Sequence, residues 1–127
     1  MRVLVVGRDE AMLELLQSFL WDFGYETEVA ADGLECCAFL REFVPDVVIL
    51  DHEVLWGGSA GILARMRDDP VLAKTPVILI AERPPSEKRD SSKRPPIVGS
   101  LRTPVQLGDL LAQLRSLKRL CGSHVHH

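Results

Sequence analysis

The stretch Pro45-Asp46-Val47-Val48-Ile49-Leu50-Asp51-His52 decides the fold of this chain. Its centre, residues 47–50, is an unbroken aliphatic run, and the carboxylate of Asp51 ends it. A run of this length without polar alternation is typical of a strand covered on both faces, as in a parallel sheet between helices. Asp51 is then expected at the carboxyl end of that strand, where open α/β sheets collect ligands and chemistry. The alternative is that Asp51 only caps the loop that follows.

Length and composition describe one ordinary globular domain. The chain has 127 residues, of which 46% are hydrophobic and 26% charged, with a formal net charge of −3. This charge supplies no basic surface for nucleic acid, and no apolar run approaches the roughly 20 residues that span a bilayer. Met1 and Arg2 lead directly into a strand-like run without the architecture of a signal peptide. We therefore expect a cytoplasmic protein that binds neither nucleic acid nor membrane.

The cysteines do not indicate a disulfide framework, and the C-terminal histidines are left out of the fold prediction. Of the three cysteines, Cys36 and Cys37 are adjacent, which does not favour a disulfide. One of these two is expected in the core and the other partly exposed. The chain ends with a group that is a transition-metal ligand set, a frayed terminus or a tag remnant: His124, His126 and His127. We expect one domain over residues 1–120 and a disordered or tag-derived tail over 121–127.

Aliphatic runs and helical periodicities alternate along the chain. Buried strands are predicted at residues 3–6, 25–30, 47–50, 77–81 and 97–101. The second of these is expected to be less buried than the first, because Glu26 and Glu28 share it. The first helix is expected to begin after Asp9 as its cap and to end at Gly24. Its apolar residues recur at helical spacing: Met12, Leu13, Leu16, Phe19, Leu20 and Phe23.

Three further helices are expected. Asp32 and Gly33 open the second, which ends before Pro45 and whose inner face is predicted to be Leu34, Cys37, Ala38 and Phe43. Ser59 is expected to cap the third, which carries on one face Ile62, Leu63 and Met66. Pro104 suits the first turn of the last helix, whose apolar stripe is Leu107, Leu110, Leu111, Leu114, Leu117 and Leu120.

One stretch breaks the alternation. Residues 82–96 contain no aliphatic or aromatic side chain, so they predict a mobile loop in place of a helix between the fourth and fifth strands. The remaining strands and helices alternate, and connections between parallel strands are nearly always right-handed. Together these predict a flavodoxin-like, doubly wound, five-stranded parallel sheet in the order 2-1-3-4-5. Strands one and three are then neighbours. We expect Gly7 and Arg8 to face Asp51 across one pocket.

Several of these segments resemble the receiver domain of two-component response regulators, and together they cover most of the chain. The similar stretches are Val5-Val6, Phe23-Gly24-Tyr25-Glu26, Ala31-Asp32-Gly33, Pro45 to Asp51, Thr75 to Ile80 and Thr103-Pro104. A working receiver holds Mg²⁺ with two acidic residues after the first strand and accepts a phosphoryl group on an aspartate after the third. A Ser or Thr ends its fourth strand, and a Lys precedes the proline after the fifth. Metal, lysine and hydroxyl stabilise the negative charge of the transferring phosphoryl group.

The resemblance makes Asp51 the candidate phosphoacceptor and shows that its partners are replaced. Gly7 and Arg8 stand at the positions of the acidic pair, Ala81 at that of the hydroxyl residue and Thr103 at that of the lysine. A single carboxylate binds Mg²⁺ poorly, so we expect no resident cofactor. The hypothesis is that Arg8 pairs with Asp51 in place of the metal. In the alternative, Arg8 points to solvent.

Two loop residues extend the candidate site. Glu53 lies on the same side as Asp51 by strand parity, so it either reaches the rim of the pocket or is a solvated loop residue. Trp56 lies in a glycine-containing loop beside the pocket and either plugs the pocket or anchors a partner.

The function expected from these residues is that of an atypical, non-enzymatic receiver that binds protein partners, with an impaired phosphorylation pocket. The partners implied are a histidine kinase or an output protein, and a homodimer stays open. In a second reading, a histidine kinase still phosphorylates Asp51 while Arg8 replaces the metal. A flavodoxin-like ligand-binding protein is a third reading. It is disfavoured because residues 7–10 lack the glycines and hydroxyls that cradle phosphate.

Overall fold

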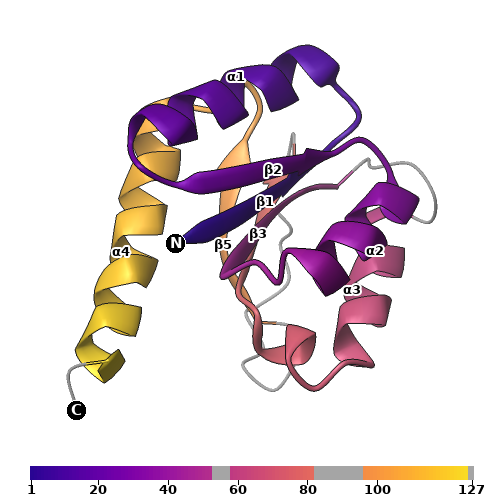
Figure 1. Ribbon diagram of the computed structural model, residues 1–127. Coiled ribbons are helices and arrows are strands. Elements are labelled where there is room, and N and C mark those ends of the chain that lie inside the picture. The colour runs from indigo at the N-terminus through magenta and orange to yellow at the C-terminus, as the bar shows by residue number, and fades with distance from the viewer. Residues whose placement is uncertain (53–57, 82–95, 126–127) are drawn as a thin grey trace.

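The computed structural model describes residues 1–52, 58–81 and 96–125, and side chains up to Lys118 with the exception of residues 58–60. Its elements are, in chain order, β1 (Arg2–Val6), α1 (Glu10–Asp22), β2 (Glu26–Ala30), α2 (Gly33–Glu42), β3 (Val47–Asp51), α3 (Gly58–Arg67), the 3₁₀ helix η1 (Leu72–Lys74), β4 (Val77–Ala81), β5 (Ile97–Arg102) and α4 (Leu107–Val125). Figure 1 shows a sheet with helices on both of its faces. No described helix is both long and apolar enough to cross a bilayer.

The sheet has the predicted topology. Its order is β2-β1-β3-β4-β5, and all neighbouring strands are parallel. The aliphatic residues of β1, β3 and β4 are buried, because helices cover both sides of these strands. β2 lies at one edge and buries fewer of its side chains, as the glutamates within it predicted.

Two hydrophobic clusters hold the helices against the sheet. On one face, α1 and α4 pack through residues that include Leu16 and Leu114, both almost fully buried. On the other face, α2 and α3 pack through residues that include Cys36, Leu40 and Met66. Figure 1 shows the same division, with α2 and α3 side by side and away from α4. The expectation that one of the two adjacent cysteines belongs to the core is confirmed, because Cys36 is buried and Cys37 is half-buried.

Local capping explains where the first helices begin and end. The Asp9 carboxylate accepts hydrogen bonds from the backbone N–H groups of Ala11 and Met12, as predicted for an N-cap. Asp32 caps α2 in the same way through the N–H of Glu35. Gly24 follows α1 with a φ of 87°, a left-handed conformation in which glycine avoids the strain of a side chain.

The predicted inner face of α2 is wrong, and the last turn of α1 needs a small correction. In α2 the buried positions are Gly33, Cys36 and Leu40, whereas Leu34 is 66% exposed and Ala38 is also exposed. Apolar residues surround most of this helix, so periodicity could not choose the face that meets the sheet. Phe23, which helical spacing placed in the last turn of α1, is instead the C-cap after Asp22 and is exposed.

The predicted starts of the last two helices also need correction. α3 begins at Gly58, so Ser59 lies inside its first turn and is not the N-cap. α4 begins at Leu107, so Pro104, which follows a cis peptide bond, lies before the helix and not in its first turn. A fourth helix is present as α4, and it continues past the expected domain end at residue 120 to Val125. The predicted loop in place of a helix between β4 and β5 concerns residues 82–95, which lie outside the described residues.

Candidate functional site

The register of β1 and β3 brings Gly7 beside Asp51. Val6 of β1 pairs with Leu50 of β3, so the residues that follow them, Gly7 and Asp51, stand at the same edge of the sheet. A Cβ atom added to Gly7 would lie 3.4 Å from the Cβ of Asp51 and 3.5 Å from its Oδ2. These distances place Gly7 directly beside Asp51. Asp51 is half-buried.

The Met12 side chain lies close to Gly7, next to the Asp51 position. Its terminal methyl group would lie 3.1 Å from a Cβ on Gly7. The side chain therefore occupies space that a larger residue at position 7 would need, although a thioether chain adapts readily to such a change. The helical spacing of Met12 predicted a place in the core, and nothing in the sequence indicated its contact with the pocket.

The charged residues after β1 have different roles. Arg8 is exposed, and its hypothesised pairing with Asp51 stays a prediction. Asp9 is held at the start of α1, where its Oδ1 lies 3.1 Å from the Ala11 nitrogen and 3.3 Å from the Met12 nitrogen. The Asp9 carboxylate stabilises the N-terminus of α1, so its role in the structure is that of a helix cap.

Two more predicted positions lie at the same edge. Ala81 ends β4 half-buried and pairs in register with Arg102, the last residue of β5. Thr103 follows directly, exposed, before the cis peptide bond to Pro104. The ends of β1, β3, β4 and β5 therefore gather Gly7, Asp51, Ala81 and Thr103. The other two candidates, Glu53 and Trp56, lie outside the described residues, and so do the side chains of the terminal histidines.

The described residues at this edge do not fit a resident Mg²⁺. Gly7 has no side chain, Arg8 is cationic, and Asp51 alone provides a carboxylate from the strand ends described above. Within the described part of the chain, no group of three or more His, Cys, Asp or Glu side chains could hold a metal ion. Mg²⁺ is usually held by one or two carboxylates together with water and substrate phosphate, and a neighbouring guanidinium opposes it.

Comparison with known proteins identifies the family. A family model described as the response regulator receiver domain matches residues 3–115. The chain belongs to the response regulator receiver domain family. Among curated relatives of this receiver domain, the response regulator PleD of Caulobacter vibrioides is 32% identical over 120 residues. The transcriptional regulatory protein TrcR of Mycobacterium tuberculosis is 31% identical over 118 residues. Each alignment covers 93% of this chain but only 26% of PleD and 45% of TrcR, so the chain spans less than half of either relative.

Solved structures agree on the fold. The chemotaxis response regulator CheY4 of Vibrio cholerae has a TM-score of 0.79 and 25% identity, covering 91% of this receiver domain and 97% of that chain. The N-terminal domain of a response regulator/sensory box/GGDEF 3-domain protein from Carboxydothermus hydrogenoformans has a TM-score of 0.78 over 99% of this chain and 100% of that one. Its 18% identity supports likeness of fold alone. The CheY-like, flavodoxin-type fold predicted from the sequence is therefore confirmed.

Proposed function

We propose that this receiver domain is an atypical protein–protein signalling module without enzymatic activity, in which Mg²⁺-dependent phosphorylation of Asp51 is impaired. The observation that carries the proposal is the placement of Gly7 against Asp51, where a receiver would need a carboxylate. Without that second carboxylate, Mg²⁺ gains too little to give up its tightly held water. Ala81 and Thr103 supply no lysine amine at the described strand ends to offset charge on a phosphoryl group.

In this proposal Arg8 takes the place of the metal ion. Arg8 follows Gly7 directly and its guanidinium is always charged, so it can pair with the Asp51 carboxylate without a cofactor. A receiver of this kind stays in the single conformation in which Arg8 pairs with Asp51. Its cytoplasmic partners, a histidine kinase or an output protein, would bind that conformation. Their binding would not depend on phosphorylation to shift the receiver between two conformations.

A second candidate is supported by the exposure of Asp51. Because this carboxylate is only half-buried, a phosphodonor can reach it, and Arg8 could then neutralise the incoming charge as a metal would. This candidate retains phosphorylation as the signal. It differs from the first in one measurable product, a phosphoryl adduct on Asp51.

One experiment separates the two candidates. The intact mass of the protein is measured after incubation with acetyl phosphate, with and without Mg²⁺, beside an Asp51→Asn control. The first candidate expects no phosphoryl adduct in either condition and no change of melting temperature on adding Mg²⁺. An adduct that the Asp51→Asn variant lacks would refute the first candidate. If that adduct also forms without Mg²⁺ and disappears in an Arg8→Ala variant, the second is supported.

A further inference from the structure

A glutamine side chain from a helix contacts each outermost strand of the sheet. The outermost described strands are β2 and β5. Gln17 of α1 donates a hydrogen bond through Nε2 to the backbone oxygen of Thr27 in β2, at 3.0 Å. Gln113 of α4 donates through Nε2 to the backbone oxygen of Ser100 in β5, at 3.1 Å. Added strands pair with the backbone groups of an edge strand, so each glutamine occupies an acceptor that such a strand could use.

The Gln113 amide also covers the residue before Ser100. Gly99 is buried, and a Cβ atom built on it would collide with Oε1 of Gln113. Any side chain at this position would push the amide away, so the contact between Gln113 and β5 requires glycine at position 99. A cavity of about 430 Å³ lies beside the contact, between β5 and α4, and Val98 and Leu117 are among its apolar walls. The glutamine side chain therefore has space into which it can swing.

The Gln113 amide is only half satisfied in this position. Its orientation is fixed, because the Ser100 oxygen is an acceptor and must face the NH₂ group. The Oε1 atom is then buried and has no hydrogen-bond partner among the described residues. A buried acceptor without a donor is unfavourable, and the same atom would be hydrated if the side chain swung into solvent. The contact is therefore weak enough for the backbone N–H of another strand to displace it.

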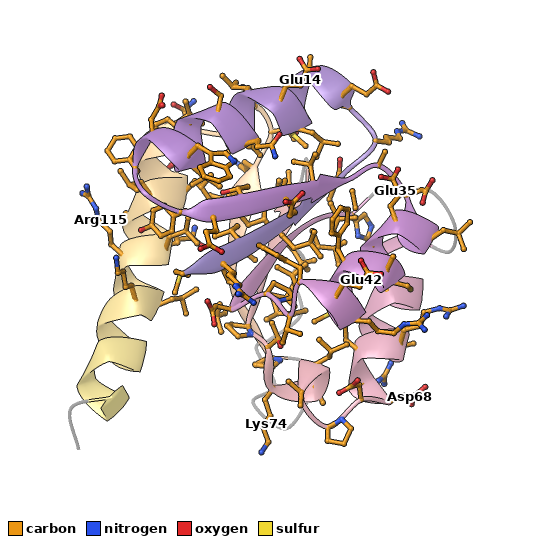
Figure 2. All side chains as sticks on the ribbon, in the orientation of Figure 1. Glu14, Glu35, Glu42, Asp68, Lys74 and Arg115 are labelled. Atoms are coloured by element: carbon orange, nitrogen blue, oxygen red, sulfur yellow. The ribbon has the colours of Figure 1, made fainter. Side chains whose placement is uncertain are left out.

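Two cations that follow Gln113 on α4 are engaged away from β5. Figure 2 shows Arg115 on the side of α4 away from the sheet, and its Cζ lies 6.0 Å from the ring centroid of Phe23. The Nζ of Lys118 lies 5.8 Å from the ring centroid of Tyr25. Charged side chains on an edge strand discourage its pairing with another chain. These two cations do not supply that protection to β5, because they stack on aromatic rings elsewhere.

The two outermost strands differ in the charges that they carry. If β2 paired over its full length with its own copy in the antiparallel direction, Glu28 would stand opposite Glu28 of the second copy. Like charges directly opposite each other destabilise a sheet. In the same arrangement of β5, the one charged residue of the strand, Arg102, would stand opposite Ile97. Charge therefore opposes self-pairing of β2 and does not oppose self-pairing of β5.

We propose that Gln113 is an autoinhibitory contact that blocks the outer edge of β5, and that this edge fits β5 of a second copy of the chain. With Gln113 in place the Ser100 oxygen is occupied, and the edge does not pair. Once the side chain is displaced, two β5 strands pair in the antiparallel direction and join two sheets into one. The copies are identical, so the interface is two-fold symmetric and closes as a dimer.

This inference goes beyond the proposed function and does not depend on it. The proposed function concerns Asp51 and is tested by a phosphoryl adduct. Gln113 is not among the residues gathered around Asp51, and its role is tested by the mass of the assembled chain in solution. Either proposal can therefore fail without the other.

Two variants of the full chain remove the contact by different routes. Gln113→Met keeps the length of the side chain without its amide, and Gly99→Ala keeps the amide but pushes it from its place. The matched controls are Gln17→Met, which removes the corresponding contact at β2, and Gly108→Ala, where an added Cβ meets no atom within 4 Å. Circular dichroism and melting temperature confirm that each variant is folded. Sedimentation velocity at about 10 to 300 µM protein, a range that reveals weak dimers, measures the Kd of dimerisation.

Both Gln113→Met and Gly99→Ala should dimerise with a Kd at least about tenfold lower than that of the wild-type chain and of the two controls. Gln113→Met should melt within about 3 °C of the wild type, because the contact that it loses was only half satisfied. Adding Ser100→Lys to Gln113→Met should restore the wild-type Kd, since lysine on an edge strand opposes pairing.

Three results would overturn the proposal. The first is a wild-type Kd in either folded variant of the β5 contact. The second is equal dimerisation of Gln17→Met, because the effect would then not be specific to β5. The third is dimerisation that Ser100→Lys does not remove, because the two copies would then meet through another surface.

Discussion

Replacing Gly7 by aspartate should place a second carboxylate against Asp51 and make the pocket sensitive to Mg²⁺. The Cβ of the new residue would lie 3.4 Å from that of Asp51, so the two carboxylates would be about 4 Å apart. The matched control is Gly7→Asn, which has nearly the same size and the same contact with Met12 but no charge. The difference between the two variants therefore isolates electrostatic repulsion from steric effects.

The size of that repulsion follows from the distance. Two unit charges about 4 Å apart repel by about 4 kcal/mol at an effective dielectric constant of about 20. Asp51 is only half-buried, so screening by solvent reduces the net cost to about 1 to 2 kcal/mol. In a domain of this size that cost should lower the melting temperature of the aspartate variant by about 5 °C relative to the asparagine variant. Saturating Mg²⁺, at about 100 times its Kd, should return about 2.7 kcal/mol.

Differential scanning fluorimetry at low ionic strength measures both effects. The gap between the Gly7→Asp and Gly7→Asn variants should close when Asp51→Asn is added to each, because one of the two charges is then gone. The wild-type chain and the asparagine variant should not respond to Mg²⁺. Equal melting temperatures for the two variants, or a gap that survives Asp51→Asn, would show that residue 7 and Asp51 do not share a pocket.

Three further predictions concern the scaffold. Asp9→Ala should cost about 1 kcal/mol in urea unfolding because the α1 cap is lost, whereas Glu10→Ala should cost less. Leu16→Ala should cost about 2 to 5 kcal/mol because Leu16 is 1% exposed, and Leu15→Ala, at a residue 55% exposed, should stay within about 0.5 kcal/mol. Burial, with smaller contributions from neighbouring charges, raises the pKa of Cys36 from 9.0 to about 12. As the pH rises, the thiol therefore ionises in the unfolded chain before it does in the folded one. The contribution of Cys36 to the free energy of unfolding is complete below pH 9 and should be about 1.4 kcal/mol lower at pH 10. Unfolding curves at alkaline pH should show that Cys36→Ala removes this loss.

The strands could be predicted because their signal is local. Aliphatic runs such as residues 47–50 and 77–81 have few alternatives to a strand covered on both faces, and the structure places strands there. Caps such as Asp9 are also local, because the side chain binds N–H groups two and three residues away. The order of the strands followed from the handedness of the crossovers, a rule that holds for nearly all such connections.

The faces of the helices could be predicted only where the apolar stripe is narrow. In α4 the stripe is distinct, and Leu110, Leu111 and Leu114 are buried as expected. In α2 the apolar residues extend over most of the surface, and the prediction selected the side that lines a cavity between α2 and α3. Packing against β2 and α3 decided which side is buried, because only one side of a helix can meet the sheet.

The sequence by itself determined which residues reach the carboxyl edge of the sheet and that Asp51 stands there among Gly7, Ala81 and Thr103. Periodicity and chain connectivity are enough for this, since parallel strands all end at one edge. Only the tertiary structure decided how close these residues come, that the Met12 side chain lies beside Gly7, and that a cavity lies between α2 and α3. These features depend on distances between elements far apart in the chain. Such distances are set by the packing of the whole core and have no local pattern that reports them.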